Sequence, residues 1–68
     1  MNVLLLGSGG REHAFAMKIC ESDRLSRLFV APGNAGTAQF GTAINLNPTD
    51  LDEVYAFCKQ NEIQLVVP

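Results

Sequence analysis

The sequence has few basic residues, few cysteines and no long apolar run. Five lysines and arginines face seven acidic residues, giving a net charge of −2. The basic residues form no stripe or run that matches a duplex, so nucleic acid is not expected as a partner. The first apolar run, Val3 to Leu6, stops at Gly7 and is too short for a signal-peptide core or a membrane span. We therefore expect a cytoplasmic protein without a membrane partner.

The two cysteines, Cys20 and Cys58, fall within predicted helices and lack the spacing of metal ligands. Such scattered cysteines are typical of a reducing compartment, where they are buried free thiols. A Cys20–Cys58 disulfide is the alternative, because a Cα separation cannot be read from sequence. The sequence contains neither a metal-ligand cluster nor a Ser-His-Asp or Cys-His arrangement. We therefore predict no metal site and no catalytic residue in this chain.

Strands and helices are expected to alternate along the 68 residues. The continuous apolarity of Val3–Leu6 is typical of a strand buried on both faces of a parallel sheet. The other predicted strands are Arg27–Ala31, Thr42–Leu46 and Ile63–Val67, and the predicted helices run from about Arg11 to Ser22 and from about Asn47 onward. This order predicts one α/β domain, residues 1–68, with a mostly parallel sheet and flanking helices. Because no helix follows the last strand, we expect an incomplete sheet in a piece of a longer protein.

Each predicted helix carries an apolar face. The first is expected to pack through its apolar side chains, which are Ala14, Phe15, Ala16, Met17, Ile19 and Cys20. The second has apolar residues at i, i+3, i+4 and i+7, which are Leu51, Val54, Tyr55 and Cys58. Its cap is predicted to be either Asn47, followed by Pro48 at the first helical position, or Thr49.

A glycine-rich turn, Gly7-Ser8-Gly9-Gly10, joins the first strand to the first helix. Unpaired N–H groups and the helix dipole favour an anion at such a helix start, and glycines allow close approach. The turn therefore predicts a phosphate site, with a purely structural turn as the alternative. The dinucleotide fingerprint is incomplete, because Glu12 occupies its third glycine position and the second strand ends without an acidic residue. A P-loop is excluded, because no Gly-Lys-Ser or Gly-Lys-Thr is present.

Charged residues follow the glycines directly. Arg11 can make a bidentate contact with a phosphate or carboxylate, and Glu12 can accept from a sugar hydroxyl or an amine. The alternatives are a solvated charge at Arg11 and a carboxylate favoured by the helix dipole at Glu12. His13 is expected to be a packed, hydrogen-bonded histidine, because nothing in the sequence orients it as a base.

The loop Pro32–Thr37 follows the second predicted strand. Ligands of open α/β sheets bind outside the carboxyl ends of the strands, so this loop and the glycine-rich turn are predicted to face one crevice. Asn34 offers an amide and Thr37 a hydroxyl, while Gly33 and Gly36 permit a mobile or closely approaching backbone. The alternative is a plain turn set by Pro-Gly and Asn.

Two long motifs carry a resemblance to a known family. Val3 to Ala14 resembles the start of glycinamide ribonucleotide synthetases, and Ala31 to Ala38 matches that family's second signature at the expected separation. The segment Ile63–Pro68 is similar to a strand that precedes a Gly-Pro-Glu loop, although Pro68 stands where the family usually has valine and glycine. The resemblance covers the whole chain, but only the first part of a family member.

The resemblance implies a Rossmann-like, pre-ATP-grasp domain at the amino terminus of an ATP-grasp ligase. The family joins glycine to phosphoribosylamine in purine biosynthesis, through an acyl phosphate made with ATP and magnesium or manganese. The ATP-grasp portion lies downstream, so this piece is expected to bind no cofactor and to be inactive alone, with the rest of the ligase chain as its partner. The implied substrate-binding residues are Gly9, Gly10 and Arg11 near the phosphate, Glu12 near the ribose or amine, and Asn34 and Thr37 on the facing loop.

Three other functions remain open at this point. The first is a Rossmann-type NAD(P) module, which the incomplete fingerprint disfavours and a titration with NAD tests. The second is a phosphosugar-binding module without catalysis, and the third is another ATP-grasp enzyme with a similar amino-terminal domain. The strings Gly-Arg-Glu-His and Pro-Gly-Asn-Ala-Gly-Thr favour the glycine ligase.

Overall fold

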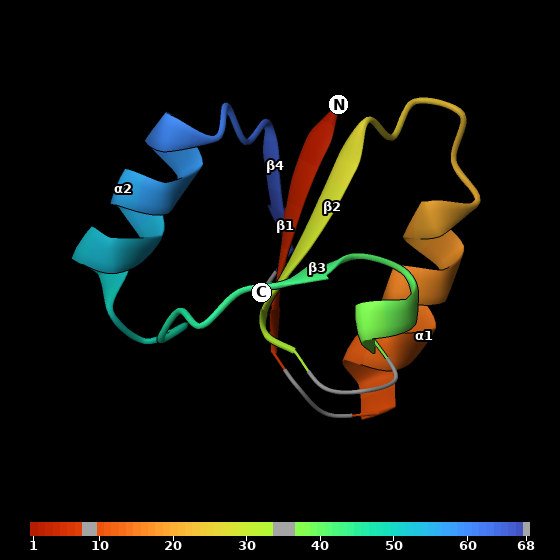
Figure 1. Ribbon diagram of the computed structural model, residues 1–68, viewed down its shortest axis with the longest axis horizontal. Coiled ribbons are helices and arrows are strands. Elements are labelled where there is room, and N and C mark those ends of the chain that lie inside the picture. Colours follow the sequence, from red (N-terminus) through yellow and green to blue (C-terminus); the bar gives the residue numbers. More distant parts are fainter. Residues whose placement is uncertain (8–9, 34–36, 68) are drawn as a thin grey trace.

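The computed structural model is a parallel sheet with a helix on each face (Figure 1). It describes the backbone of residues 1–7, 10–33 and 37–67, and the side chains of these residues other than 10–13. The elements are β1 (Asn2–Gly7), α1 (Gly10–Cys20), β2 (Arg27–Pro32), the 3₁₀ helix η1 (Thr37–Gln39), β3 (Thr42–Ala43), α2 (Leu51–Gln60) and β4 (Leu65–Val67). This order confirms the predicted alternation of strands and helices.

The sheet has the strand order β3-β2-β1-β4, and all of its pairings are parallel. β1 is therefore central, and its Val3, Leu4 and Leu5 are buried. An inner strand of a parallel sheet buries both of its faces, which explains the continuous apolar run. The predicted α/β class, with a mostly parallel Rossmann-like sheet and flanking helices, is confirmed.

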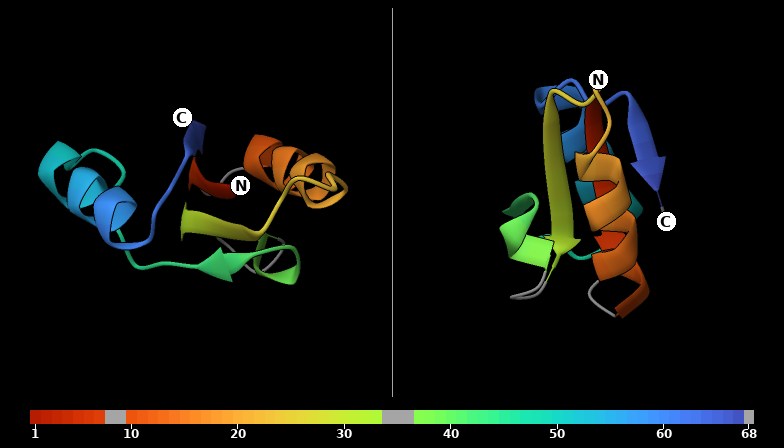
Figure 2. Two further views of the ribbon diagram at one scale, coloured as in Figure 1. Left: turned by 90° about the horizontal axis from the view of Figure 1, so that it is seen from above. Right: turned by 90° about the vertical axis from the view of Figure 1, so that its right-hand side faces the viewer.

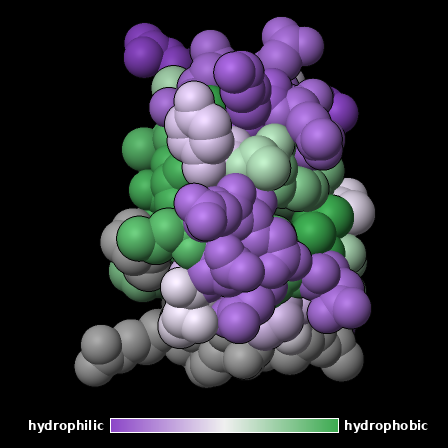
Figure 3. Space-filling model, turned by 90° about the vertical axis from the view of Figure 1, so that its left-hand side faces the viewer, coloured by the Kyte–Doolittle hydropathy of each residue, from purple (hydrophilic) through white to green (hydrophobic). Residues whose placement is uncertain are grey.

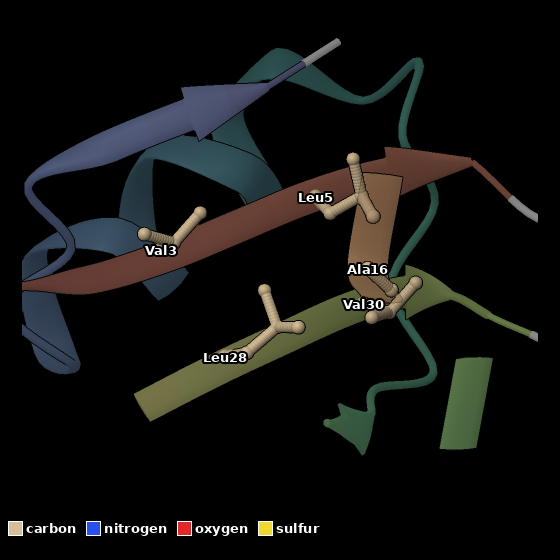
Figure 4. Close-up of a cluster of buried hydrophobic side chains, with 5 residues drawn as sticks. All are labelled: Val3, Leu5, Ala16, Leu28 and Val30. Atoms are coloured by element: carbon tan, nitrogen blue, oxygen red, sulfur yellow. The ribbon is translucent and has the colours of Figure 1, made fainter. Parts of the chain in front are cut away.

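One face of the sheet packs against α1. Val3 and Leu5 of β1 lie beside Leu28 and Val30 of β2, and their side chains meet Ala16 of α1 (Figure 4). Alternate residues of a strand share a face, so these strand residues form one apolar surface. The small Ala16 side chain lets α1 approach that surface closely.

The other face packs against α2, so the sheet lies between the two helices (Figure 2). Leu4, Phe29 and Ala31 form the sheet side of this cluster, together with the buried Leu46. On the helix side, the Phe57 ring meets the Phe29 ring edge-on, with centroids 5.2 Å apart and planes at 82°. Edge-to-face rings of this kind contribute about 0.5–1.5 kcal/mol beyond their area burial.

The predicted apolar face of α1 is partly wrong. Ala16 is buried and Ile19 is half-buried against the sheet, but Phe15 and Met17 are 50% and 47% exposed. Ala14 and Cys20 are exposed as well. The helix meets the sheet through a narrow stripe, and the described part of the chain leaves about half of the Phe15 and Met17 surface uncovered.

The predicted face of α2 is also partly wrong. Val54 and Cys58 pack against the sheet as expected, but Leu51 and Tyr55 are 78% and 68% exposed. The edge-on contact of Phe57 with Phe29 rotates the helix toward Phe57 and away from Tyr55. The outward side of α2 is consequently mostly hydrophilic, with apolar surface beside it (Figure 3).

The cap of α2 is Asp50, which corrects the prediction of Asn47 or Thr49. The Asp50 carboxylate accepts from the Glu53 N–H at 3.2 Å, as an N-cap does with the third helical residue. The Asn47 side chain instead closes the preceding turn, accepting from the N–H and the hydroxyl of Thr49 at 3.0 and 2.8 Å. The Asn47 oxygen is thus engaged before the helix begins.

Two strands are shorter than predicted. β3 stops at Ala43, because the Ile44 N–H still donates to Val30 but the Leu46 N–H donates locally to Ile44. β4 begins at Leu65 rather than Ile63, because the Ile63 N–H donates to the Cys58 carbonyl at the end of α2. Ile44 and Ile63, which were predicted to lie in these strands, instead pack into the apolar cluster between the sheet and α2, called the α2-side cluster below.

Both cysteines are free thiols. Cys58 is half-buried on α2, whereas Cys20 is exposed, so the prediction of burial is wrong for Cys20. Among the helices of the described residues, none has the length and apolarity needed to cross a membrane.

Candidate functional site

The glycine-rich turn and the Pro32–Thr37 loop start side by side at the carboxyl edge of the sheet. Gly7 ends β1 and Pro32 ends β2, and the two are register partners. The Gly33 N–H donates to the Gly7 carbonyl oxygen at 3.3 Å. β1 and β2 both end at this edge of the sheet (Figure 1). Residues far apart in sequence are thus joined where open α/β sheets bind ligands.

Helix α1 begins at this same edge. Gly7 has a positive φ of 137°, which L side chains rarely adopt, and α1 starts three residues later at Gly10. The first four N–H groups of a helix have no acceptor within it, and the dipole places positive charge there. The carboxyl edge of β1 therefore presents a helix start suited to an anion such as a phosphate.

The predicted site residues are distributed over this edge. Gly10, Arg11 and Glu12 form the beginning of α1, although the side chains of Arg11, Glu12 and also His13 lie outside the described residues. Gly9 and Asn34 lie outside them entirely. The substrate contacts assigned to these residues stay predictions.

Thr37 opens η1 and is fully buried. Its carbonyl accepts from the N–H groups of Phe40 and Gly41, at 3.0 and 3.1 Å. Its hydroxyl lies against Gly33, where an added Cβ would stand 3.3 Å from Thr37 Oγ1. This geometry favours a supporting role, in which Thr37 fixes the end of the loop from inside.

Sequence reasoning missed Gly41, which closes the segment after η1. A Cβ at Gly41 would lie 2.8 Å from the Leu28 carbonyl oxygen and 2.9 Å from Leu28 Cγ. Only a glycine allows this approach to β2. The sequence signal was a glycine just before a short strand, which marks close backbone contact.

The described residues offer little ionisable chemistry near this edge. Burial raises the pKa of the Cys58 thiol, but Cys58 packs into the α2-side cluster, away from the loops. The described side chains include no group of three or more His, Cys, Asp or Glu that can hold a metal ion.

An apolar groove lies at the opposite end of the sheet. It is lined by Met1 and Val3 at the start of β1, by Leu65 at the start of β4, and by residues at and after the end of α1. It is apolar and separate from the loops at the carboxyl edge, so we do not assign the phosphate site to it.

Comparison with known proteins identifies relatives over nearly the whole chain. The family model described as "Phosphoribosylglycinamide synthetase, N domain" matches residues 1–68. A phosphoribosylamine–glycine ligase of Rhodopirellula baltica is 52% identical over 66 residues, covering 97% of this chain and 15% of that protein. One from Mesorhizobium japonicum is 54% identical over 67 residues, covering 98% of this chain and 16% of that protein.

A longer relative has a different organisation. A bifunctional purine biosynthetic protein of Schizosaccharomyces pombe is 41% identical over 70 residues, covering 96% of this chain and 9% of that protein. The chain thus spans a sixth or less of the length of each of these relatives.

Proposed function

Because this chain belongs to the phosphoribosylglycinamide synthetase N-domain family, we propose that it is the phosphoribosyl-binding part of a phosphoribosylamine–glycine ligase. The observation that carries the proposal is the Gly33-to-Gly7 hydrogen bond, which joins two loops beside the start of α1. A phosphosugar needs both an anion site and polar groups facing it. In this proposal the glycine-rich turn supplies the anion site and the Pro32–Thr37 loop supplies the polar groups.

The phosphate binds at the start of α1. The backbone N–H groups of Gly9 and Gly10 approach it closely, because neither residue has a side chain. Arg11 adds a charge-assisted, bidentate contact. Glu12 accepts from a ribose hydroxyl or from the amine, and Asn34 completes the facing side. Thr37 supports that side from within, since its side chain is fully buried.

Holding the phosphate positions the amine for reaction. Binding energy gained at the phosphate, remote from the reacting nitrogen, offsets the entropy lost when the amine is aligned with an acyl group. The residues of this chain thus orient the nucleophile. In this proposal they supply no catalytic group.

ATP and a divalent metal ion belong, in this proposal, to the part of the ligase outside these residues. When bound there, they supply activation of the glycine carboxylate. The ligase works in the cytoplasm, where the free thiols of Cys20 and Cys58 remain reduced. The 68-residue piece alone is inactive.

A titration with glycinamide ribonucleotide tests the proposal. In an amide ¹H–¹⁵N NMR spectrum, we expect selective shifts at Gly9, Gly10, Arg11, Glu12 and Asn34, and little response to NAD. The same titration is made with a chimera, the Rhodopirellula baltica ligase whose matching segment is replaced by this chain. The chimera keeps the test valid if the short chain needs further residues to fold.

Arg11→Ala provides the sharpest variant. We expect it to weaken ribonucleotide binding by about tenfold or more, because a charge-assisted contact contributes about 1.5–3 kcal/mol. Lys18→Ala is the matched control, since Lys18 is an exposed cation at the other end of the same helix. Equal binding by both variants would contradict the phosphate role of Arg11. A response to NAD would instead support a dinucleotide module.

A further inference from the structure

An apolar groove lies at the amino end of the strands, opposite the phosphate site. Its volume is about 160 Å³, and the residues that line it are Met1, Val3, Ile19, Ser22, Arg24, Leu25 and Leu65. Met1 and Leu65 remain 44% and 47% exposed. Clustered exposed apolar side chains of this kind mark interaction surfaces rather than surfaces that stay exposed to solvent.

The groove is open because α1 covers only part of its face. α1 packs over β1 and β2 through Ala16 and Ile19, while β4 lies beside the helix and uncovered by it (Figure 2, right). Leu65 of β4 is the register partner of Val3, so it continues the apolar surface outward. Among the described strands, none lies beside the outer backbone edge of β4, and proteins normally cover such an edge.

The topology indicates which kind of segment covers this face. α1 lies on one face of the sheet and connects β1 to β2, which is a step toward the β3 edge. α2 lies on the other face and connects β3 to β4, which is a step toward the opposite edge. If the chain added a new strand beside β4, a helix would connect the two strands. Because crossovers are right-handed, that helix would lie on the same face of the sheet as α2. Such a step leaves the groove open, so its cover comes from elsewhere.

We propose that the groove docks an amphipathic helix from a part of the ligase chain outside these 68 residues. The inference rests on the proposed function, and on the fact that the chain covers only 15% and 16% of two ligases that it matches. A helix is the element that covers a face of a parallel sheet, and helices pack side by side at 8–10 Å. An occupant of that width lies alongside α1 and over Leu65.

The rim of the groove sets the polarity of the docking helix. Arg24 places a cation among the residues that line the groove. A helix carboxyl end, or acidic side chains flanking the apolar stripe, complements this charge.

Thiol labelling in the chimera described above tests the docking. In a background of Cys20→Ser and Cys58→Ala, Leu65→Cys reports on the groove and Gln60→Cys, at the exposed end of α2, is the control. We expect Leu65→Cys in the chimera to react about tenfold or more slowly than Gln60→Cys, as a covered position does. In the 68-residue chain the two should react at similar rates.

Equal labelling of the two positions in a chimera that still makes glycinamide ribonucleotide would overturn the docking proposal alone. Protection that disappears on dilution would overturn it as well, because the cover would then be a second copy. A chimera that is protected but does not bind the ribonucleotide would support docking and contradict the proposed function. Leu25→Cys, a second groove position, repeats the test if Leu65→Cys does not fold.

Discussion

The Gly33 N–H donates a hydrogen bond of 3.3 Å to the Gly7 carbonyl oxygen. This bond continues the pairing of β1 and β2 beyond the end of the sheet, and it joins the residues from which the two loops start. Gly33 has a φ of 75°, a left-handed backbone conformation that favours glycine. The relative position of the two proposed halves of the phosphoribosyl site depends on this residue.

Gly33→Ala should disturb both stability and binding. The left-handed backbone costs a residue with a side chain about 1–2 kcal/mol, and the added Cβ would stand 3.3 Å from Thr37 Oγ1 and from the Val30 carbonyl oxygen. We expect a loss of about 1–2 kcal/mol in the free energy of unfolding, measured by urea titration, and weaker ribonucleotide binding. Ala38→Ser, at an exposed position of η1, is the control. Unchanged ribonucleotide binding would show that the phosphoribosyl site does not depend on Gly33.

The sequence was sufficient to predict the architecture but not the helix faces. β1 was predicted because a strand buried on both sides is continuously apolar. The buried face of α2 was not predicted correctly. Tyr55 and Phe57 are both aromatic, and the sequence does not show which of them contacts Phe29. The contact joins Phe29 and Phe57, which are 28 positions apart, and the periodicity of one helix carries no information about such a distant contact.

The candidate site was predicted in the same uneven way. Motif and strand order predicted that the loops after β1 and β2 meet, and the Gly33-to-Gly7 bond agrees with this. The burial of Thr37 was not predicted, because a hydroxyl in a glycine-rich loop gives no sign of which way it points. The close approach of Gly41 to Leu28 requires knowledge of the path of the chain between η1 and β3.

Asp50→Ala should destabilise the chain more than Thr49→Ala. Asp50 caps α2 by accepting from the Glu53 N–H, and loss of such a cap costs about 1 kcal/mol. Thr49 lies in the turn before the helix and donates to Asn47, so we expect its removal to cost less than half as much. Urea unfolding followed by circular dichroism measures both variants. A larger effect at Thr49 would restore that residue as the cap.

Phe57→Ala and Tyr55→Ala should differ strongly although they lie two residues apart on α2. Phe57 packs edge-on against Phe29, so its loss should reduce the free energy of unfolding by about 2 kcal/mol. Tyr55 is 68% exposed, and its loss should cost about 0.5 kcal/mol or less. Similar effects of the two substitutions would mean that the helix is rotated toward Tyr55 in solution.

Ionisation of Cys58 should destabilise the fold at alkaline pH. Burial against the α2-side cluster disfavours the thiolate and raises the pKa of Cys58 above its ordinary value of 9.0. A thiol whose pKa is higher in the folded than in the unfolded chain stabilises the fold below the unfolded pKa. That contribution is lost as the pH rises through the folded pKa.

In a Cys20→Ser background, the rate of alkylation of Cys58 by iodoacetamide should therefore reach half its maximum at a higher pH in buffer than in concentrated urea. Cys58→Ala should remove this part of the alkaline loss of stability. Identical pH midpoints in buffer and in urea would show that Cys58 is solvated like a thiol of the unfolded chain, and would contradict its packing against the sheet.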